Sequence, residues 1–440
     1  MSLRTALVDV RPLARAPAFR RLWLGGVVSG FGGQLTSFAI TFHVWDRTRD
    51  PAMVGLIGLF TAAPLIAFAL IGGTAADRVD RRRLVLASTW GQVGTSLGLA
   101  GVAAFAGDAV WAMLAIAAVA SALSALGAPA RRALVPTLLP GDQLAAGLAL
   151  THLSFQASLL LGPAAAGALV ALWGTAVCFV IDAGTFVLAL IALAGLPTLA
   201  AGTRPAGSQP GGTGAGGEPG GTGPAGSQPG GTPSPGGRAV GAGIRFAAGN
   251  PVVRGAFLTD LCATVLAMPV ALFPVLNAEK FGGSPAVLGL FTTALAVGGV
   301  LASAVSGFTT RQPRPGRLLL ACVTVWGAAL AGVGLADQLP VVLGLIAVAG
   351  AADTWSVVAR GTVVQHVTPE AYRGRVSALE HVVGVAGPQL GGLRAGLVAA
   401  GTGGGVALLL GGFGCLAGVG LIAARIPQLR RLTIGPAPPA

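Results

Sequence analysis

The chain has 440 residues, of which 53% are hydrophobic and only 10% are charged, and its formal net charge is +13. Because a typical soluble domain carries about 25% charged residues, this composition excludes a soluble globular protein and indicates a polytopic membrane protein. The basic residues are scattered in short clusters between apolar runs, so we expect no basic surface for nucleic acid.

Apolar runs of about 20 residues are long enough to cross the bilayer as helices. The charges before the first run are spread too widely for a cleavable signal peptide. In chain order the predicted spans are 22–45, 52–76, 84–106, 109–129, 144–172, 174–198, 251–277, 286–309, 316–336, 340–366, 376–400 and 404–426. The runs are apolar on all sides, unlike the alternating strands of a membrane barrel. The predicted fold class is therefore all-α, with twelve transmembrane helices.

The distribution of the basic residues predicts the orientation of these spans, because cytoplasmic loops hold the excess of Lys and Arg. With the N-terminus inside, all but five basic residues fall in inside segments. Arg47, Arg49 and Lys280 lie outside, and Arg360 and Arg394 lie within predicted spans. This alternation predicts a multi-pass protein of the cytoplasmic (inner) membrane of a bacterium, with both termini in the cytoplasm.

Residues 199–238 differ from the rest of the chain, since they consist mostly of Gly, Pro, Ser, Thr and Ala and contain the nonapeptide PAGSQPGGT twice. Such a sequence cannot bury enough apolar surface to become ordered. We predict a disordered cytoplasmic linker between an N-terminal six-helix bundle, residues 1–198, and a C-terminal six-helix bundle, residues 239–440. A binding role for the linker remains an alternative.

The two predicted bundles carry traces of each other. Residues 73–86 (GTAADRVDRRRLVL) and 307–320 (GFTTRQPRPGRLLL) each follow the second span of their half and share Gly, Arg and two Leu at equivalent positions. Parallel repeats of six spans imply two bundles that face each other across a central cavity. This is the architecture of a secondary transporter.

The loop between the second and third spans holds six charges in seven positions, from Asp77 to Arg83. The arginines at 81–83 are explained by orientation alone. Asp77 is different, because it lies where the helix dipole is already negative and needs a positive partner such as Arg78 or another helix N-terminus. Gly73, one turn earlier, allows a neighbouring helix to approach closely. We interpret the segment as a charged cytoplasmic latch, formed by Gly73, Asp77, Arg78, Arg81, Arg82 and Arg375.

The pattern G-x-x-x-D-R-x-x-R-R at residues 73–82 resembles the loop 2–3 signature of the major facilitator superfamily, although Asp80 stands where the family usually has glycine. The resemblance covers essentially the whole chain, since twelve spans, a central linker and two halves agree with it. It implies that Asp77 meets the N-terminal end of the eleventh span near Arg375 and stabilises the outward-facing state.

Further segments, including PARRALVPTLLP (129–140) and VVQHVTPEAYRGRVSAL (363–379), resemble the branch of this family that holds siderophore exporters and proton-coupled drug exporters of multidrug resistance. Two Gly-Pro elements, in the fifth and eleventh spans, are similar to the glycine–proline motif of antiporters. In a span, Gly-Pro permits a bend and close packing, although ordinary usage of these residues is the alternative. The elements comprise Gly162, Pro163, Gly387, Pro388, Gly391 and Gly392.

Ionisable residues inside a bilayer are costly, so each one is a functional candidate. Asp260 in the seventh span, Asp353 in the tenth and Asp182 in the sixth are candidates for proton coupling. The alternative is a carboxylate paired with Arg or a backbone donor for packing alone. The first span lacks the acidic residue that several drug exporters use.

Other polar residues in the spans are candidates for the cavity or a proton relay: Gln34, His152, Gln156, Arg394 and Glu380. Arg394 falls in the outer half of the eleventh span, and we expect its partner to be an acid such as Asp353 or an anionic substrate. His152 and Glu380 lie nearer the cytoplasmic end, where they could relay protons or form local hydrogen bonds.

The sequence contains no GxxxxGK[ST] motif, no nucleophile elbow and no metal-ligand spacing among its four cysteines, which argues against an ATP-driven pump, an enzyme, a metal site or a cofactor. We predict a secondary transporter, functional as a monomer in the lipid bilayer. It exports a small organic molecule, a siderophore or an amphipathic drug, by alternating access and in exchange for protons. An importer on the same fold, and a non-transporting membrane scaffold or receptor, remain open.

Overall fold

The computed structural model describes residues 10–78, 81–195, 244–305 and 312–434, and the side chains of residues 69–82 lie outside this description. All regular elements within these ranges are helical, and none of the described residues forms a strand. The all-α fold class is confirmed. The total of twelve spans and the orientation of the termini stay predictions, and the predicted linker, residues 199–238, lies entirely outside the described residues.

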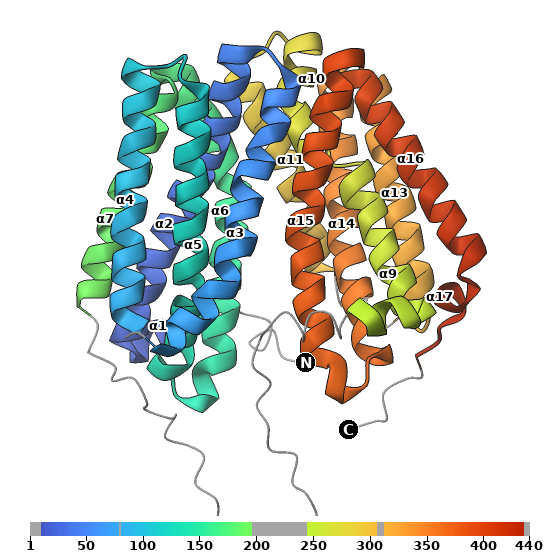
Figure 1. The fold of residues 1–440 in the computed structure, drawn as a ribbon, viewed down its shortest axis with the longest axis horizontal. Helices are drawn as coiled ribbons and strands as arrows, with labels where there is room; N and C mark the ends of the chain where they lie inside the picture. Colours follow the sequence, from blue (N-terminus) through green and yellow to red (C-terminus); the bar gives the residue numbers. More distant parts are fainter. Residues whose placement is uncertain (1–9, 79–80, 196–243, 306–311, 435–440) are drawn as a thin grey trace, which may run out of the picture.

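The first half of the chain forms one group of helices, on the left of Figure 1. Its elements are α1 (Arg11–Arg15), α2 (Pro17–Thr48), α3 (Pro51–Arg78), α4 (Arg81–Phe105), α5 (Val110–Leu138), α6 (Gly141–Trp173) and α7 (Thr175–Ala194). The long helices run alternately up and down the view, and α3 begins at the upper end.

The second half forms another group, on the right of Figure 1. Residues 244–249 are helical. The elements that follow are α9 (Pro251–Leu261), η2 (Cys262–Leu266), η3 (Val270–Leu272), α10 (Phe273–Lys280), α11 (Pro285–Ala304), α13 (Pro315–Leu335), α14 (Leu339–Val367), α15 (Glu370–Thr402), α16 (Gly404–Arg425) and α17 (Pro427–Arg431). One turn repeats in both halves: Gly174 joins α6 to α7 with φ 79°, and Gly403 joins α15 to α16 with φ 86°. Both turns use a backbone conformation that favours glycine.

Ten helical segments in the described residues are long and apolar enough to cross a membrane. The long helices α2 and α4 are not among them. Ser, Thr, Gln and Gly residues lower the hydropathy of both helices, which contain Thr36 and Ser96, for example. These polar side chains bind a buried carboxylate between the helices, as described below. Hydropathy alone therefore underestimates how well α2 and α4 fit a bilayer.

The seventh predicted span, residues 251–277, is confirmed as a segment that could cross a membrane, Pro251–Lys280, but it is not one continuous helix. After α9 the chain forms one turn of π-helix (η2), leaves helical structure at residues 267–269, and continues through the short 3₁₀ helix η3 into α10. Pro269 explains the interruption, because it has no N–H to donate and disfavours helical geometry at the preceding residue, Met268.

The two halves pack against each other through two helix pairs, α3 with α15 and α6 with α11. Glycines allow this approach near the upper end. A methyl group added at Gly289 of α11 would lie 2.7 Å from the carbonyl oxygen of Pro163 in α6, and one at Gly55 of α3 would lie 2.8 Å from that of Gly392 in α15. The backbones thus touch without intervening side chains.

The buried apolar residues show that the two halves share a core at one end of the molecule only. The largest cluster takes residues from both halves, such as Phe38 of α2, Phe273 of α10 and Phe291 of α11. The other two clusters each stay within one half, around Phe19 in the first and Leu429 in the second. The core therefore joins the halves at the upper end of Figure 1, whereas the cores at the lower end are separate.

Candidate functional site

A cavity of about 370 Å³ lies between the two halves. Helices α2 and α6 contribute from the first half, and η3, α10, α11 and α14 contribute from the second. The lining residues are Gln34, Ser37, Phe38, Thr41, Gln156, Leu159, Pro163, Val270, Phe273, Leu288, Thr292, Leu295, Ala296, Gly299, Gly350, Asp353 and Thr354. The cavity lies below the upper closure, where Pro163 meets α11.

Asp353 is the one ionisable side chain among the described residues that line this cavity. It lies near the middle of the 29-residue helix α14, and its surface is exposed rather than buried. Arg360 lies two turns later on the same helix, and none of the described ion pairs joins it to Asp353. Of the three acidic residues proposed from the sequence for proton coupling, Asp353 is the one that faces the space between the halves.

Hydroxyl and amide groups supply the remaining polarity of the cavity. Thr41, Thr292 and Thr354 each donate their hydroxyl hydrogen to a backbone carbonyl oxygen three or four residues earlier in their own helices, at 2.9, 3.0 and 3.1 Å. Their oxygen atoms therefore remain available as acceptors. Gln34 and Gln156, both proposed from the sequence, line the cavity from the first half.

Asp260 lies in a buried charge cluster inside the second half. Its carboxylate forms an ion pair with Arg360 of α14, and the two side chains are 9% and 8% exposed. Arg360 also contacts Glu380 of α15, with 3.4 Å between Nε and the carboxylate oxygen. The second carboxylate oxygen of Asp260 has no hydrogen-bond partner. Three elements, α9, α14 and α15, are thus held together by one guanidinium group.

Arg360 is the functional candidate that the sequence reasoning missed. It was recognised as a cation within a predicted span, but it received no role. Two of the proposed acids, Asp260 and Glu380, are its partners. The position of Arg360 within a span could have predicted this pairing, because an arginine inside a bilayer requires an anionic or carbonyl partner. Few acids lie in that half of the chain, so few partners were possible.

Asp182 lies in a polar cluster inside the first half, away from the cavity lining. Thr36 of α2 and Ser96 of α4 donate hydrogen bonds to one of its carboxylate oxygens at 2.8 and 2.7 Å. Thr185, one turn later in α7, lies 3.5 Å from the other. The aspartate is 1% exposed. Its hydrogen bonds join α2, α4 and α7, which is the arrangement expected of a packing role.

The structure does not pair Arg394 with Asp353, and the other expected partner, an anionic substrate, stays a prediction. No ion pair joins the two described side chains, and Arg394 Nε is buried without a hydrogen-bond partner. Its guanidinium group lies against α16, where a methyl group added at Gly411 would lie 3.2 Å from Nη2. The rotation of α15 explains the difference, because the side chain points into the second half rather than into the cavity.

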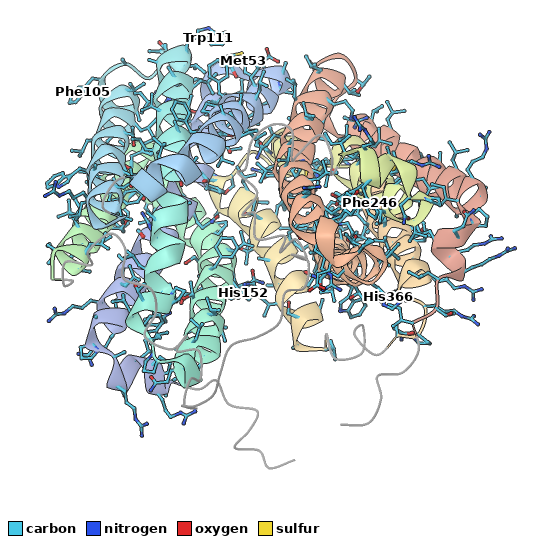
Figure 2. The ribbon with its side chains drawn as sticks, turned by 60° about the horizontal axis from the view of Figure 1, so that its bottom comes forward. Met53, Phe105, Trp111, His152, Phe246 and His366 are labelled. Atoms are coloured by element: carbon cyan, nitrogen blue, oxygen red, sulfur yellow. The ribbon has the colours of Figure 1, made fainter. Side chains whose placement is uncertain are left out.

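His152 of α6 is exposed. Figure 2, which brings the lower end of the molecule forward, shows it on the first half, with His366 on the second. Neither histidine lines the central cavity.

The glycine–proline elements lie at close contacts between helices, and both α6 and α15 continue as α-helix through Pro163 and Pro388. Gly387 and Gly391 face the interruption in the seventh span. A methyl group at Gly387 would lie 2.5 Å from Thr264 Oγ1, and one at Gly391 would overlap the backbone oxygen of Thr264. Gly162 likewise allows α6 to contact Gln34 of α2, and Gly392 contacts α3 as described above.

The proposed latch falls largely outside the described residues, since the side chains of Gly73, Asp77 and the following arginines are among those excluded. Arg375 is described. Its guanidinium carbon lies 5.7 Å from the centre of the Tyr372 ring, one turn earlier in α15. The latch stays a prediction.

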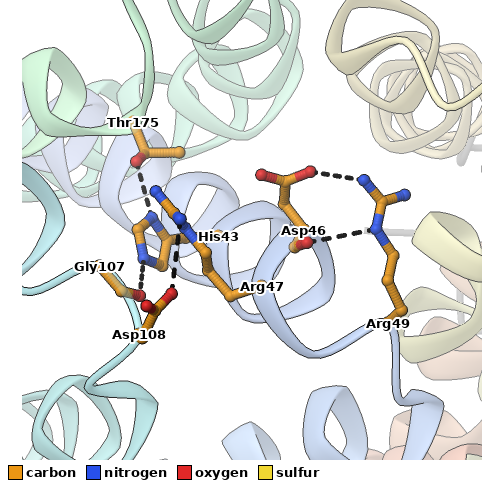
Figure 3. Close-up of polar contacts among 7 residues, drawn as sticks. All are labelled: His43, Asp46, Arg47, Arg49, Gly107, Asp108 and Thr175. Atoms are coloured by element: carbon orange, nitrogen blue, oxygen red, sulfur yellow. Dashed lines mark hydrogen bonds and ion pairs between the residues drawn. The ribbon is translucent and has the colours of Figure 1, made fainter.

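Polar contacts fix the upper end of each half. In the first half (Figure 3), His43 Nε2 donates to the carbonyl oxygen of Gly107 at 3.0 Å, and Nδ1 lies 2.9 Å from the hydroxyl oxygen of Thr175. In the second half, Lys280 Nζ donates a hydrogen bond to the carbonyl oxygen of Ala336 at 2.9 Å and forms an ion pair with Asp337. These contacts fix helix ends to neighbouring turns, which is a structural role.

Comparison with known proteins gives consistent results for both halves. Residues 9–204 match a family model described as "Transmembrane secretion effector", and residues 255–438 match one described as "Major Facilitator Superfamily". The chain is 27% identical over 421 residues to Enterobactin exporter EntS of Shigella boydii serotype 18 and of Escherichia coli O127:H6, covering 94% of this chain and 90% of each relative.

Solved structures share this fold. The nucleoside transporter NupG aligns with a TM-score of 0.67 at 12% identity, over 92% of this chain and 98% of that one. A bacterial homologue of the iron transporter ferroportin, in the inward-facing state, aligns with a TM-score of 0.67 at 16% identity, over 94% and 99%. At these identities the likeness concerns the fold.

Proposed function

Because the chain belongs to the major facilitator superfamily of membrane transporters, we propose that it is a secondary active exporter of a small organic molecule. The observation that carries the proposal is a carboxylate, Asp353, exposed in a cavity between two packed halves. A carrier needs a binding space that both halves line, and a coupled carrier also needs a group that can take up an ion there.

Alternating access is supported by the different packing at the two ends. The upper ends share a buried core and touch through glycines, whereas the lower cores are separate. We infer that the lower end, where α1 and α17 lie, faces the cytoplasm and that this is an inward-facing arrangement. The positions of the basic residues support this orientation. The charged latch around Asp77 would then form when the lower end closes.

The direction of transport is inferred from the relatives. Proteins 27% identical over 94% of this chain are named enterobactin exporters. We therefore propose efflux of a siderophore or an amphipathic drug across the cytoplasmic membrane of a bacterium. In this proposal each half is a six-helix bundle, residues 199–238 are a tether, and a single chain in the bilayer is the functional unit.

We propose proton exchange as the energy source, with Asp353 as the coupling carboxylate. Asp260 and Glu380 bind Arg360, and Asp182 accepts hydrogen bonds from hydroxyl groups, so these three acids already have partners. No described ion pair occupies Asp353. A proton taken up there from outside would be released inside when the substrate binds.

Flux into everted membrane vesicles tests this function. With an acidic interior, vesicles that contain the protein should accumulate candidate siderophores or dyes, and collapse of the pH gradient should abolish the accumulation. Asp353→Asn should lose the gradient-driven component. Accumulation in right-side-out vesicles instead would indicate an importer, and absence of flux in both orientations would indicate a scaffold or receptor. Either result would overturn the proposal.

A further inference from the structure

The cavity lining presents hydrogen-bond acceptors and one negative charge. The hydroxyl groups of Thr41, Thr292 and Thr354 donate their hydrogens to carbonyl oxygens of their own helices, so their oxygen atoms remain available as acceptors. Asp353 adds a carboxylate next to Thr354. Donors are available only from Ser37 and the two glutamine amides. A ligand that fits this lining supplies several N–H donors and a positive charge.

The cations inside the second half are not among the residues that line the cavity. Arg360 is held by Asp260 and Glu380, and Arg394 lies against α16. Neither lines the cavity, and no Lys, Arg or His occurs among the described lining residues. An anionic ligand would therefore be desolvated without a positive partner, which is costly at low dielectric.

The remaining lining is apolar and sets the shape of the ligand. Phe38 and Leu159 lie on the first half, and Phe273, Leu288 and Leu295 lie on the second. The volume of about 370 Å³ is near the lower limit of small-molecule sites, which span roughly 300–1,000 Å³. The cavity thus fits a compact molecule with an apolar body and a polar end.

From these three features we propose that the cavity binds a small amphipathic organic cation, a protonated amine whose ammonium group is held by the carboxylate of Asp353. The threonine oxygens accept its other N–H groups, and the apolar body lies against the phenylalanine and leucine side chains. This inference rests on the proposed function and narrows its substrate class, because an iron chelator with anionic oxygen donors does not match the lining. Since one carboxylate cannot hold a proton and an ammonium group at once, binding of the amine releases the proton, and protonation releases the amine.

Three probes of similar size test the charge requirement: naphthylethylamine, its uncharged N-acetyl derivative and naphthylpropionate. Binding to the purified full-length protein is followed by naphthyl fluorescence at about pH 7.5, where a primary amine is protonated, with protein-free micelles as the blank. We expect the amine to bind more tightly than the amide by roughly ten- to a hundredfold, as expected for a charge-assisted hydrogen bond. The carboxylate should bind weakest.

Variants connect this preference to one residue. Asp353→Asn should remove the difference between amine and amide, whereas Asp353→Glu should restore part of it. Asp337→Asn is the matched control, because Asp337 pairs with Lys280 at the upper end and its side chain is 84% exposed. The control should leave all three affinities unchanged. If Asp353→Asn does not fold, Asp353→Glu is compared with the wild-type protein: the amine preference should be smaller in Asp353→Glu, and an unchanged preference would count against the site.

The outcomes separate this inference from the proposed function. Tightest binding of naphthylpropionate, or an amine preference that survives Asp353→Asn, would overturn the cation site. Gradient-driven export of an anionic siderophore would overturn it too, while leaving the exporter in place. An amine preference that depends on Asp353, in a protein without gradient-driven flux, would support the site and refute the exporter.

Discussion

Arg360 gives the most direct test of the charge cluster in the second half, because it is the common partner of two acids. Replacing it by leucine removes the only ion-pair partner that the structure gives to Asp260. That carboxylate is 9% exposed, and one of its oxygens has no hydrogen bond even in the intact protein. Arg360→Leu therefore leaves an uncompensated acid between α9, α14 and α15.

The expected loss of unfolding free energy is about 3–5 kcal/mol, the usual cost of removing one partner from a buried ion pair. Asp108→Asn provides the contrast. Arg47 and Asp108 form an ion pair at 3.5 Å, with side chains 45% and 95% exposed, and exposed pairs contribute only about 0–1 kcal/mol. Solvent screening, which is present at Asp108 and absent at Asp260, accounts for the difference.

The measurement is reversible unfolding of the purified protein in mixed micelles, with increasing denaturing detergent. The double variant Arg360→Leu/Asp260→Leu completes the cycle, and it should recover much of the stability, because a buried ion pair can be replaced by apolar residues at little cost. A loss for Arg360→Leu no larger than that for Asp108→Asn would refute the reasoning. So would a double variant as unstable as the single one.

Two further perturbations test the other half and the interface. Asp182→Ala removes the acceptor of one buried hydroxyl group, that of Ser96, and one partly buried group, that of Thr36. It should cost about 1–3 kcal/mol in the same assay, whereas Asp182→Asn, which keeps an acceptor oxygen, should cost less; equal losses would contradict this. Gly289→Val should prevent the upper ends from closing, because its side chain meets the carbonyl oxygen of Pro163. It should abolish transport, and a cysteine introduced at the cavity residue Ser37 should then react with thiol reagents added from outside. Gly344→Val, at a position with open space around it, is the control and should transport normally.

The helical fold could be predicted from the sequence, because runs of apolar residues near the thickness of a bilayer leave few alternatives. Hydropathy was less informative at α2 and α4, whose polar residues lower the average. Thr36 and Ser96 show the reason: they bind Asp182 inside the bundle and do not face lipid. A hydropathy scale scores each residue alone. It therefore cannot include a hydrogen bond between a polar side chain and a partner on another helix.

The candidate site could be predicted only in part, because pairing depends on how each helix is rotated. Position along the span was enough to select Asp353, Asp260 and Asp182. It could not tell that one faces the cavity, one binds Arg360, and one is enclosed by hydroxyl groups. For the same reason the span position of Arg394 could not tell that its side chain points toward α16 and not toward an acid such as Asp353.

The glycine–proline element of α15 shows that a motif can determine the structure of a neighbouring helix. Its residues were interpreted as permitting a bend and close packing of the eleventh span, and α15 does pack closely there while it runs through Pro388 as helix. The helix that breaks is the seventh span, at η2 and residues 267–269, and Gly387 and Gly391 lie directly against its Thr264. A π-turn widens a helix locally, so the facing surface has to be free of side chains. The glycines supply that space, while Pro269 supplies the break.

Because Val270 and Phe273 follow immediately and line the cavity, the interruption sets where the seventh span presents its side chains to the ligand. The glycine–proline element thus contributes to the shape of the cavity without lining it.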